Sequence, residues 1–77
     1  MSKYTLWDIP SSTLLLETRE LNVIAESTTK FVLDNGEEAL SDLMLGIEPD
    51  DSSPVHDHSG VHILEAIAGE QGAVRVR

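Results

Sequence analysis

The sequence contains no cysteine, and only five of its 77 residues are lysine or arginine. Without cysteine the fold cannot be held by disulfides, and thiolate metal sites are excluded. The five cations stand against 14 aspartate and glutamate residues, which gives a formal net charge of −9. Because affinity for a phosphate backbone or an anionic membrane surface comes mainly from lysine and arginine, we expect the chain to bind neither nucleic acid nor membrane.

Aromatic side chains and long apolar runs are also scarce. The only aromatic residues are Tyr4, Trp7 and Phe31, and the longest aliphatic run is Leu14-Leu15-Leu16. That run is far too short to span a membrane. The first residues lack an apolar stretch of signal-peptide length, so the expected location is cytoplasmic. A chain of this length forms a single small domain over residues 1–77, with a thin core.

The first third of the chain predicts a β-hairpin. Residues 4–9 and 13–17 are rich in aromatic, β-branched and aliphatic side chains, which favour strands. Pro10, Ser11 and Ser12 lie between them and have the composition of a turn. Two short strands joined by so short a connection are typical of a hairpin.

Residues 19–34 give the best helical pattern. Apolar and small residues recur there at spacings of three and four, at Leu21, Ile24, Ala25, Thr28, Phe31 and Val32. Thr18 is the expected N-cap of this helix. Asn35-Gly36 should end it, because glycine accepts the left-handed conformation that follows many helices.

The second half of the chain is less regular. Residues 37–48 predict a short helical or turn lead-in at 37–40 and a strand at 42–48. The acidic, histidine-containing stretch 49–60 is expected to be a flexible loop. Residues 61–68 fit a buried strand or a two-turn helix, and both remain open. Residues 70–77 are expected to fray as a tail, in which 70–72 fit a turn and 73–77 could instead form an edge strand.

Together these segments predict an α+β fold of two layers. A small antiparallel sheet of three to four strands is covered on one face by one main helix, in the order ββαββ.

Part of this order is similar to a group of short bacterial proteins without an assigned activity. The resemblance rests on Leu6-Trp7-Asp8 in the hairpin, on the helix ending at Asn35-Gly36, and on Asp42-Leu43-Met44-Leu45-Gly46 in the following strand. It covers about the first two thirds of the chain and implies the same organisation there. After residue 50 the group would imply a shorter loop and an apolar final helix.

Three histidines are the densest set of metal-capable side chains. His56 and His58 would point to the same side of an extended segment, and His62 could add a third ligand. The alternative is that all three are solvated loop residues. The same side chains could titrate near neutral pH, although the loop could also change charge without structural consequence.

No other pattern indicates chemistry. The sequence has no phosphate-binding glycine loop and no nucleophile-elbow motif, and so small a chain has little room for a pocket that excludes water. We therefore expect no enzyme activity and no cofactor.

The strands carry aliphatic side chains on both faces. Leu14-Leu15-Leu16 and Leu43-Met44-Leu45 do not alternate with polar residues, as a half-exposed sheet should. One helix covers one face, so Leu15 and Met44 are expected to mark an interface on the other, buried in a homodimer. The competing explanation is that 61–77 folds over that face as a helix.

Trp7 is expected to lie in the core, packed on the helix through Phe31. The alternative is that Trp7 is an exposed anchor at an interface.

The expected function is therefore a small non-catalytic protein-interaction module that forms a homodimer. One alternative is an acidic antitoxin-like or nucleic-acid-mimicking protein, whose charge would complement a basic protein partner. Its hairpin-then-helix order is analogous to that of small antitoxins with a partial ribonuclease-H-like fold. The other alternative is a metal-binding protein that uses the histidine loop.

Overall fold

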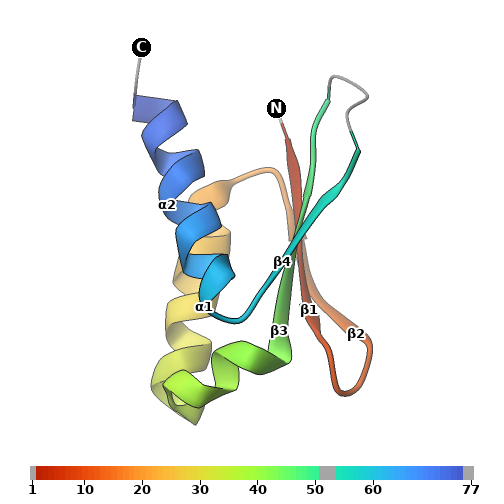
Figure 1. Cartoon of the computed structure of the whole chain (residues 1–77), viewed down its shortest axis with the longest axis vertical. Helices are drawn as coiled ribbons and strands as arrows, with labels where there is room; N and C mark the ends of the chain where they lie inside the picture. Colours follow the sequence, from red (N-terminus) through yellow and green to blue (C-terminus); the bar gives the residue numbers. More distant parts are fainter. Residues whose placement is uncertain (1, 51–53, 76–77) are drawn as a thin grey trace.

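The computed structural model of the chain describes residues 2–50 and 54–75. The elements in chain order are β1 (Lys3–Asp8), β2 (Thr13–Thr18), α1 (Leu21–Asn35), the 3-10 helix η1 (Glu37–Asp42), β3 (Leu43–Glu48), β4 (His56–Ser59) and α2 (Val61–Arg75). Figure 1 shows two layers, with the sheet on one side and both long helices on the other. The predicted α+β class and the order ββαββ are confirmed, with the last strand at 56–59. A second helix as long as the first follows, so the face predicted for one main helix holds two.

The four strands form one sheet in the order β2-β1-β3-β4, and all neighbours are antiparallel. β1 and β3 are the central strands, and Leu6 of β1 lies opposite Leu45 of β3 and Leu16 of β2. The register between β1 and β2 shifts by one residue after Leu6, so that Trp7 pairs with Leu14 and Leu15 has no partner across the strand. Leu15 is therefore the extra residue of a β-bulge.

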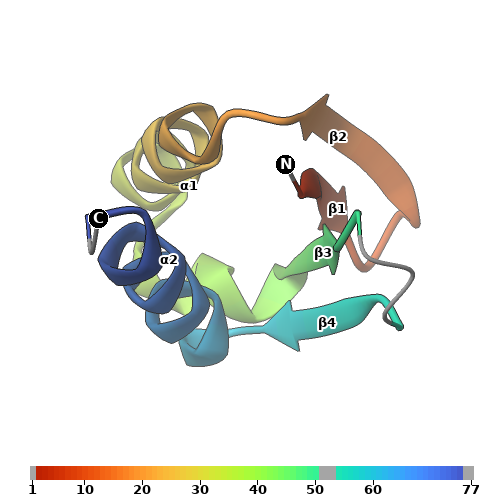
Figure 2. The same ribbon diagram turned by 90° about the horizontal axis from the view of Figure 1, so that it is seen from above.

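The core lies between the sheet and the two helices. Its buried apolar residues are Tyr4, Leu6, Ile24, Leu40, Leu43, Leu45, Ile47, Ile63 and Ile67. In Figure 2, α1 and α2 lie side by side over the same face of the curved sheet. Every residue of the predicted apolar face of the first helix is buried or half-buried, which confirms that face.

The boundaries of α1 follow local hydrogen bonding. The predicted N-cap is wrong: the helix begins at Leu21, two residues later than predicted, so Glu20 is the N-cap and its side chain makes no capping hydrogen bond. The hydroxyl of Thr18 accepts a hydrogen bond from the backbone N–H of Glu20, just before the helix. At the other end, Gly36 adopts a φ of 90° and donates its N–H to the carbonyl of Val32 at 2.7 Å. The predicted stop at Asn35-Gly36 is confirmed, as is the short helical segment that leads into the third strand.

The C-terminal third differs from the sequence prediction. Residues 56–59, expected to belong to a flexible loop, form β4, which pairs with β3 along an edge of the sheet. Residues 61–68 are the first half of α2 and not a strand, and 70–75 continue that helix, so neither an edge strand nor a frayed tail occurs there. The loop prediction also covers 51–53, and the tail prediction 76–77; both lie outside the described residues.

Hydrophobic burial explains α2. Ile63 and Ile67 stand one turn apart and are both buried, whereas Val61 and Leu64 are exposed. None of the helices in the described ranges is long and apolar enough to cross a membrane.

One polar contact joins α2 to the sheet. The hydroxyl of Tyr4 donates a hydrogen bond to Oε2 of Glu70 at 3.3 Å. Burial raises the pKa of the Tyr4 phenol, and the negative charge and hydrogen bond of Glu70 raise it further. Because the raised pKa favours the protonated phenol in the folded state, this contribution to stability is present below pH about 10 and is lost as the pH rises above it.

This contact predicts the titration of the single tyrosine. The midpoint of phenolate formation should lie above the ordinary value of about 10. Glu70→Gln should lower that midpoint without returning it fully to the ordinary value, because burial is the larger cause. The measurement is near-ultraviolet absorbance against pH, with Glu65→Gln as a control that removes an exposed carboxylate of the same helix. An unperturbed midpoint in the native chain would contradict the contact.

Candidate functional site

The face of the sheet that points away from the helices is the first candidate surface. Since side chains alternate along a strand, Trp7 and Met44 point to this open face, opposite their buried neighbours Leu6 and Leu45. The register places Leu14, Trp7, Met44 and Ser59 in one row across all four strands. We call these four residues the open-face row.

The open-face row corrects the prediction for the single tryptophan. Trp7 does not pack on the helix through Phe31, because the alternation that buries Tyr4 and Leu6 turns Trp7 to the opposite face. Trp7 and Met44 are half-buried although no helix covers them, since they lie side by side on adjacent strands. The alternative, an anchor at an interface, stays a prediction for this uncovered position.

The predicted interface residues lie at this end of the sheet. Met44 belongs to the open-face row, while Leu15 is the unpaired bulge residue next to Leu14. Leu14, Leu15 and Ile9 are all exposed. The competing explanation, in which the C-terminal segment covers this face, is wrong for residues 61–75: α2 packs on the same face as α1 (Figure 2).

The rest of the open face is polar. Thr5 lies beside Gly46, which in turn pairs with Asp57. At the far end, Nζ of Lys3 lies 3.8 Å from a carboxylate oxygen of Glu17 and 3.2 Å from one of Glu48. The apolar part of this face is therefore confined to the end nearest the β1–β2 turn.

The predicted metal ligands do not come together. His56 and His58 pair with Ile47 and Leu45, so they share one side of β4, as expected for an extended segment. His62 lies beyond the turn at Gly60, on the exposed side of α2, with Nδ1 3.4 Å from Oε2 of Glu65. In the described ranges no group of three or more His, Asp or Glu side chains could hold a metal ion. The change of direction at Gly60 is the physical reason.

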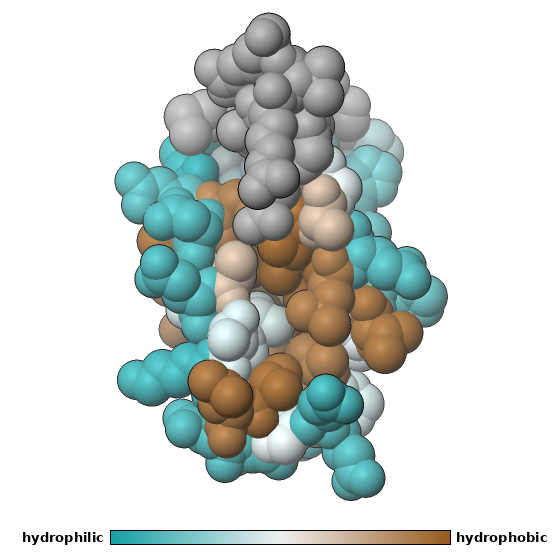
Figure 3. All heavy atoms as spheres, turned by 90° about the vertical axis from the view of Figure 1, so that its left-hand side faces the viewer, coloured by the Kyte–Doolittle hydropathy of each residue, from teal (hydrophilic) through white to brown (hydrophobic). Residues whose placement is uncertain are grey.

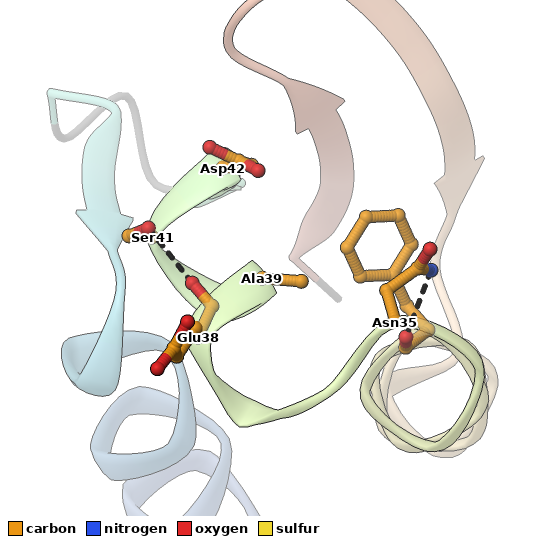
Figure 4. A pocket seen from close by; sticks show the side chains of 6 residues that line it. Asn35, Glu38, Ala39, Ser41 and Asp42 are labelled. Carbon is orange, nitrogen blue, oxygen red and sulfur yellow. Dashed lines mark hydrogen bonds between the residues drawn. The ribbon is translucent and has the colours of Figure 1, made fainter.

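A hollow of about 510 Å³ lies between the end of α1 and η1 (Figure 4). Two of its polar side chains form hydrogen bonds with backbone carbonyls of the preceding turn. Asn35 Nδ2 donates to the carbonyl of Phe31 at 3.0 Å, and Ser41 Oγ donates to the carbonyl of Glu38 at 2.9 Å. The carboxylates of Glu38 and Asp42 complete the polar lining. The Ser41 hydroxyl thus donates to a backbone carbonyl rather than to either carboxylate of this set.

Comparisons of the chain with protein-family models, with curated proteins and with solved structures find no match.

The short distance between Gly46 and Thr5 allows their placement on the open face to be tested. A Cβ atom added at Gly46 would lie 2.6 Å from Oγ1 of Thr5. We expect Gly46→Ala to destabilise the fold by about 1–3 kcal/mol through overpacking. Thr5→Ala should relieve most of this loss in the double variant, as measured by urea unfolding.

Gly69 provides the matched control for this substitution. A Cβ at Gly69 would meet nothing within 4 Å, so Gly69→Ala within α2 should stabilise the chain by up to about 1 kcal/mol. Additive effects of Thr5→Ala and Gly46→Ala would show that the two residues do not meet on this face.

Proposed function

We propose that the chain is a small, non-catalytic, cytoplasmic protein-interaction module that forms a homodimer through the open face of its sheet. The observation that carries the proposal is the position of Trp7 and Met44 in a row that both helices leave uncovered. Tryptophan and methionine are enriched at protein interfaces, where tryptophan often contributes most of the binding energy.

The composition of the open-face row favours a second copy as the occupant. Leu14, Trp7, Met44 and Ser59 carry no charge, so two copies that meet along this row place no like charges in direct contact. In a twofold dimer the same patch serves both subunits. The exposed Leu15 and Ile9 would extend the apolar contact at its rim.

The charged end of the open face is compatible with this arrangement. The carboxylates of Glu17 and Glu48 share Lys3, which offsets part of their negative charge. These side chains are half-exposed, so their ion pairs contribute little to folding stability and can rearrange at an interface rim. The carboxylates of this face, at Glu17, Glu48 and Asp57, thus lie outside the open-face row.

Sedimentation equilibrium over a wide concentration range tests the dimer. We expect a dimer whose dissociation constant rises at least tenfold, about 1.4 kcal/mol, when Met44→Lys places a charge in the row. The monomer should remain folded, because Met44 lies on an uncovered face and a lysine can extend its ammonium into water. Circular dichroism checks that fold.

Leu33→Lys is the control for this experiment. It adds the same charge at an exposed position on the helical side and should leave the dimer unchanged. Trp7 fluorescence gives a second readout, because dimerisation should shift its emission to shorter wavelength. A chain that stays monomeric well above micromolar concentration would refute the proposal.

A further inference from the structure

A second apolar surface lies on the opposite side of the molecule, along the outer side of the helical layer. A groove of about 490 Å³ runs where α1, η1 and α2 meet. Its apolar lining consists of Val32, Leu33, Leu40, Val61 and Leu64. Figure 3 views the molecule from this side and shows hydrophobic side chains gathered along the middle, between hydrophilic flanks.

The lining of the groove is unusually exposed for apolar residues. Leu33 is 79% exposed, Val61 65% and Leu64 51%. They come from both long helices, so the surface is continuous across two elements and is not a scattered set of single residues. A rimmed apolar patch of this kind usually marks an interaction site.

The rim of the groove is acidic. Glu37 and Glu38, at the start of η1, both line it. Over residues 21–42 there is one cation, Lys30, against five carboxylates, at Glu26, Asp34, Glu37, Glu38 and Asp42. A partner with basic side chains beside its apolar surface would therefore be electrostatically complementary.

This charge also decides against a second copy as the occupant. Two such grooves facing each other would bring Glu37 and Glu38 of both subunits close together, and like charges at an interface are costly. The groove differs in this respect from the open-face row, which is uncharged.

The floor of the groove includes a buried hydroxyl. Thr28 lines the groove and is 1% exposed, and its Oγ1 has no hydrogen-bond partner in the described part of the chain. A buried hydroxyl without a partner is destabilising.

We propose that this groove binds a basic amphipathic helix of another protein. A third helix laid between α1 and α2 would place apolar residues, spaced by three and four, on Leu33, Val61 and Leu64. Its basic residues would then face Glu37 and Glu38. The proposal does not depend on the dimer, because it uses the opposite side of the molecule.

The first test is a nuclear magnetic resonance titration with a synthetic peptide of about four helical turns, roughly 14 residues. The peptide carries leucine on one face and lysine on the other, and a second peptide has glutamate at every lysine position. We expect the lysine peptide to shift the amide signals of the second half of α1, of η1 and of the start of α2. We expect the glutamate peptide to bind at least tenfold more weakly.

Variants then locate the contact. Leu33→Asp, at an exposed position that should not affect folding, and the double variant Glu37→Gln/Glu38→Gln should each raise the peptide dissociation constant at least tenfold. The matched control Glu17→Gln/Glu20→Gln removes two exposed carboxylates that do not line the groove, and should change it less than twofold. Met44→Lys should leave peptide binding unchanged even where it dissociates the dimer.

Three results would overturn the proposal. The first is no binding of the lysine peptide up to millimolar concentration. The second is an equal loss of affinity in both double variants, or amide shifts centred on the open face of the sheet; either would indicate general attraction or another site. The third is loss of the dimer in Leu33→Asp, which would assign the groove to a second copy of the chain.

Discussion

The fold depends on the alternation of side chains along the two central strands. Leu6 and Leu45 lie opposite each other on one face of β1 and β3 and are almost completely buried. Ile24 of α1 and Ile63 of α2 belong to the same core. In a domain this small, one apolar layer between sheet and helices contributes most of the stabilising burial. Every residue next to those leucines is consequently turned to the other face, which no helix covers.

Charge is distributed unequally between the two sides. Lys3 forms ion pairs with Glu17 and Glu48, and Arg19 lies 3.2 Å from Asp50, so these two cations pair with carboxylates on strands or at their ends. The helical side has an acidic rim around exposed leucine and valine side chains. One molecule thus presents an uncharged apolar row on its sheet and an acidic apolar groove on its helices, and these surfaces suit different partners.

The candidate surfaces were predicted from sequence to different degrees. Met44 could be assigned to an uncovered face because three consecutive apolar residues must place one on each side of a strand. The orientation of Trp7 was mispredicted, because composition favours a core position for a lone tryptophan while strand register decides its face. The groove was not predicted, since it needs α1, η1 and α2 to meet. The exposed Leu33, outside the apolar stripe of α1, was its only sequence signal.

Local signals determined the N-terminal two thirds of this protein. The turn residues after Ile9, the spacing of three and four in α1 and the stop at Gly36 act within a few residues, so their prediction needed no tertiary information. Tertiary structure alone decided the last third. The hydrophilic β4 exists because its backbone pairs with β3. Residues 61–75 are helical because a helix places Ile63 and Ile67 one turn apart against the core and leaves Glu65 exposed, whereas a strand would turn Glu65 to the same face as both isoleucines. Neither effect is visible in local composition.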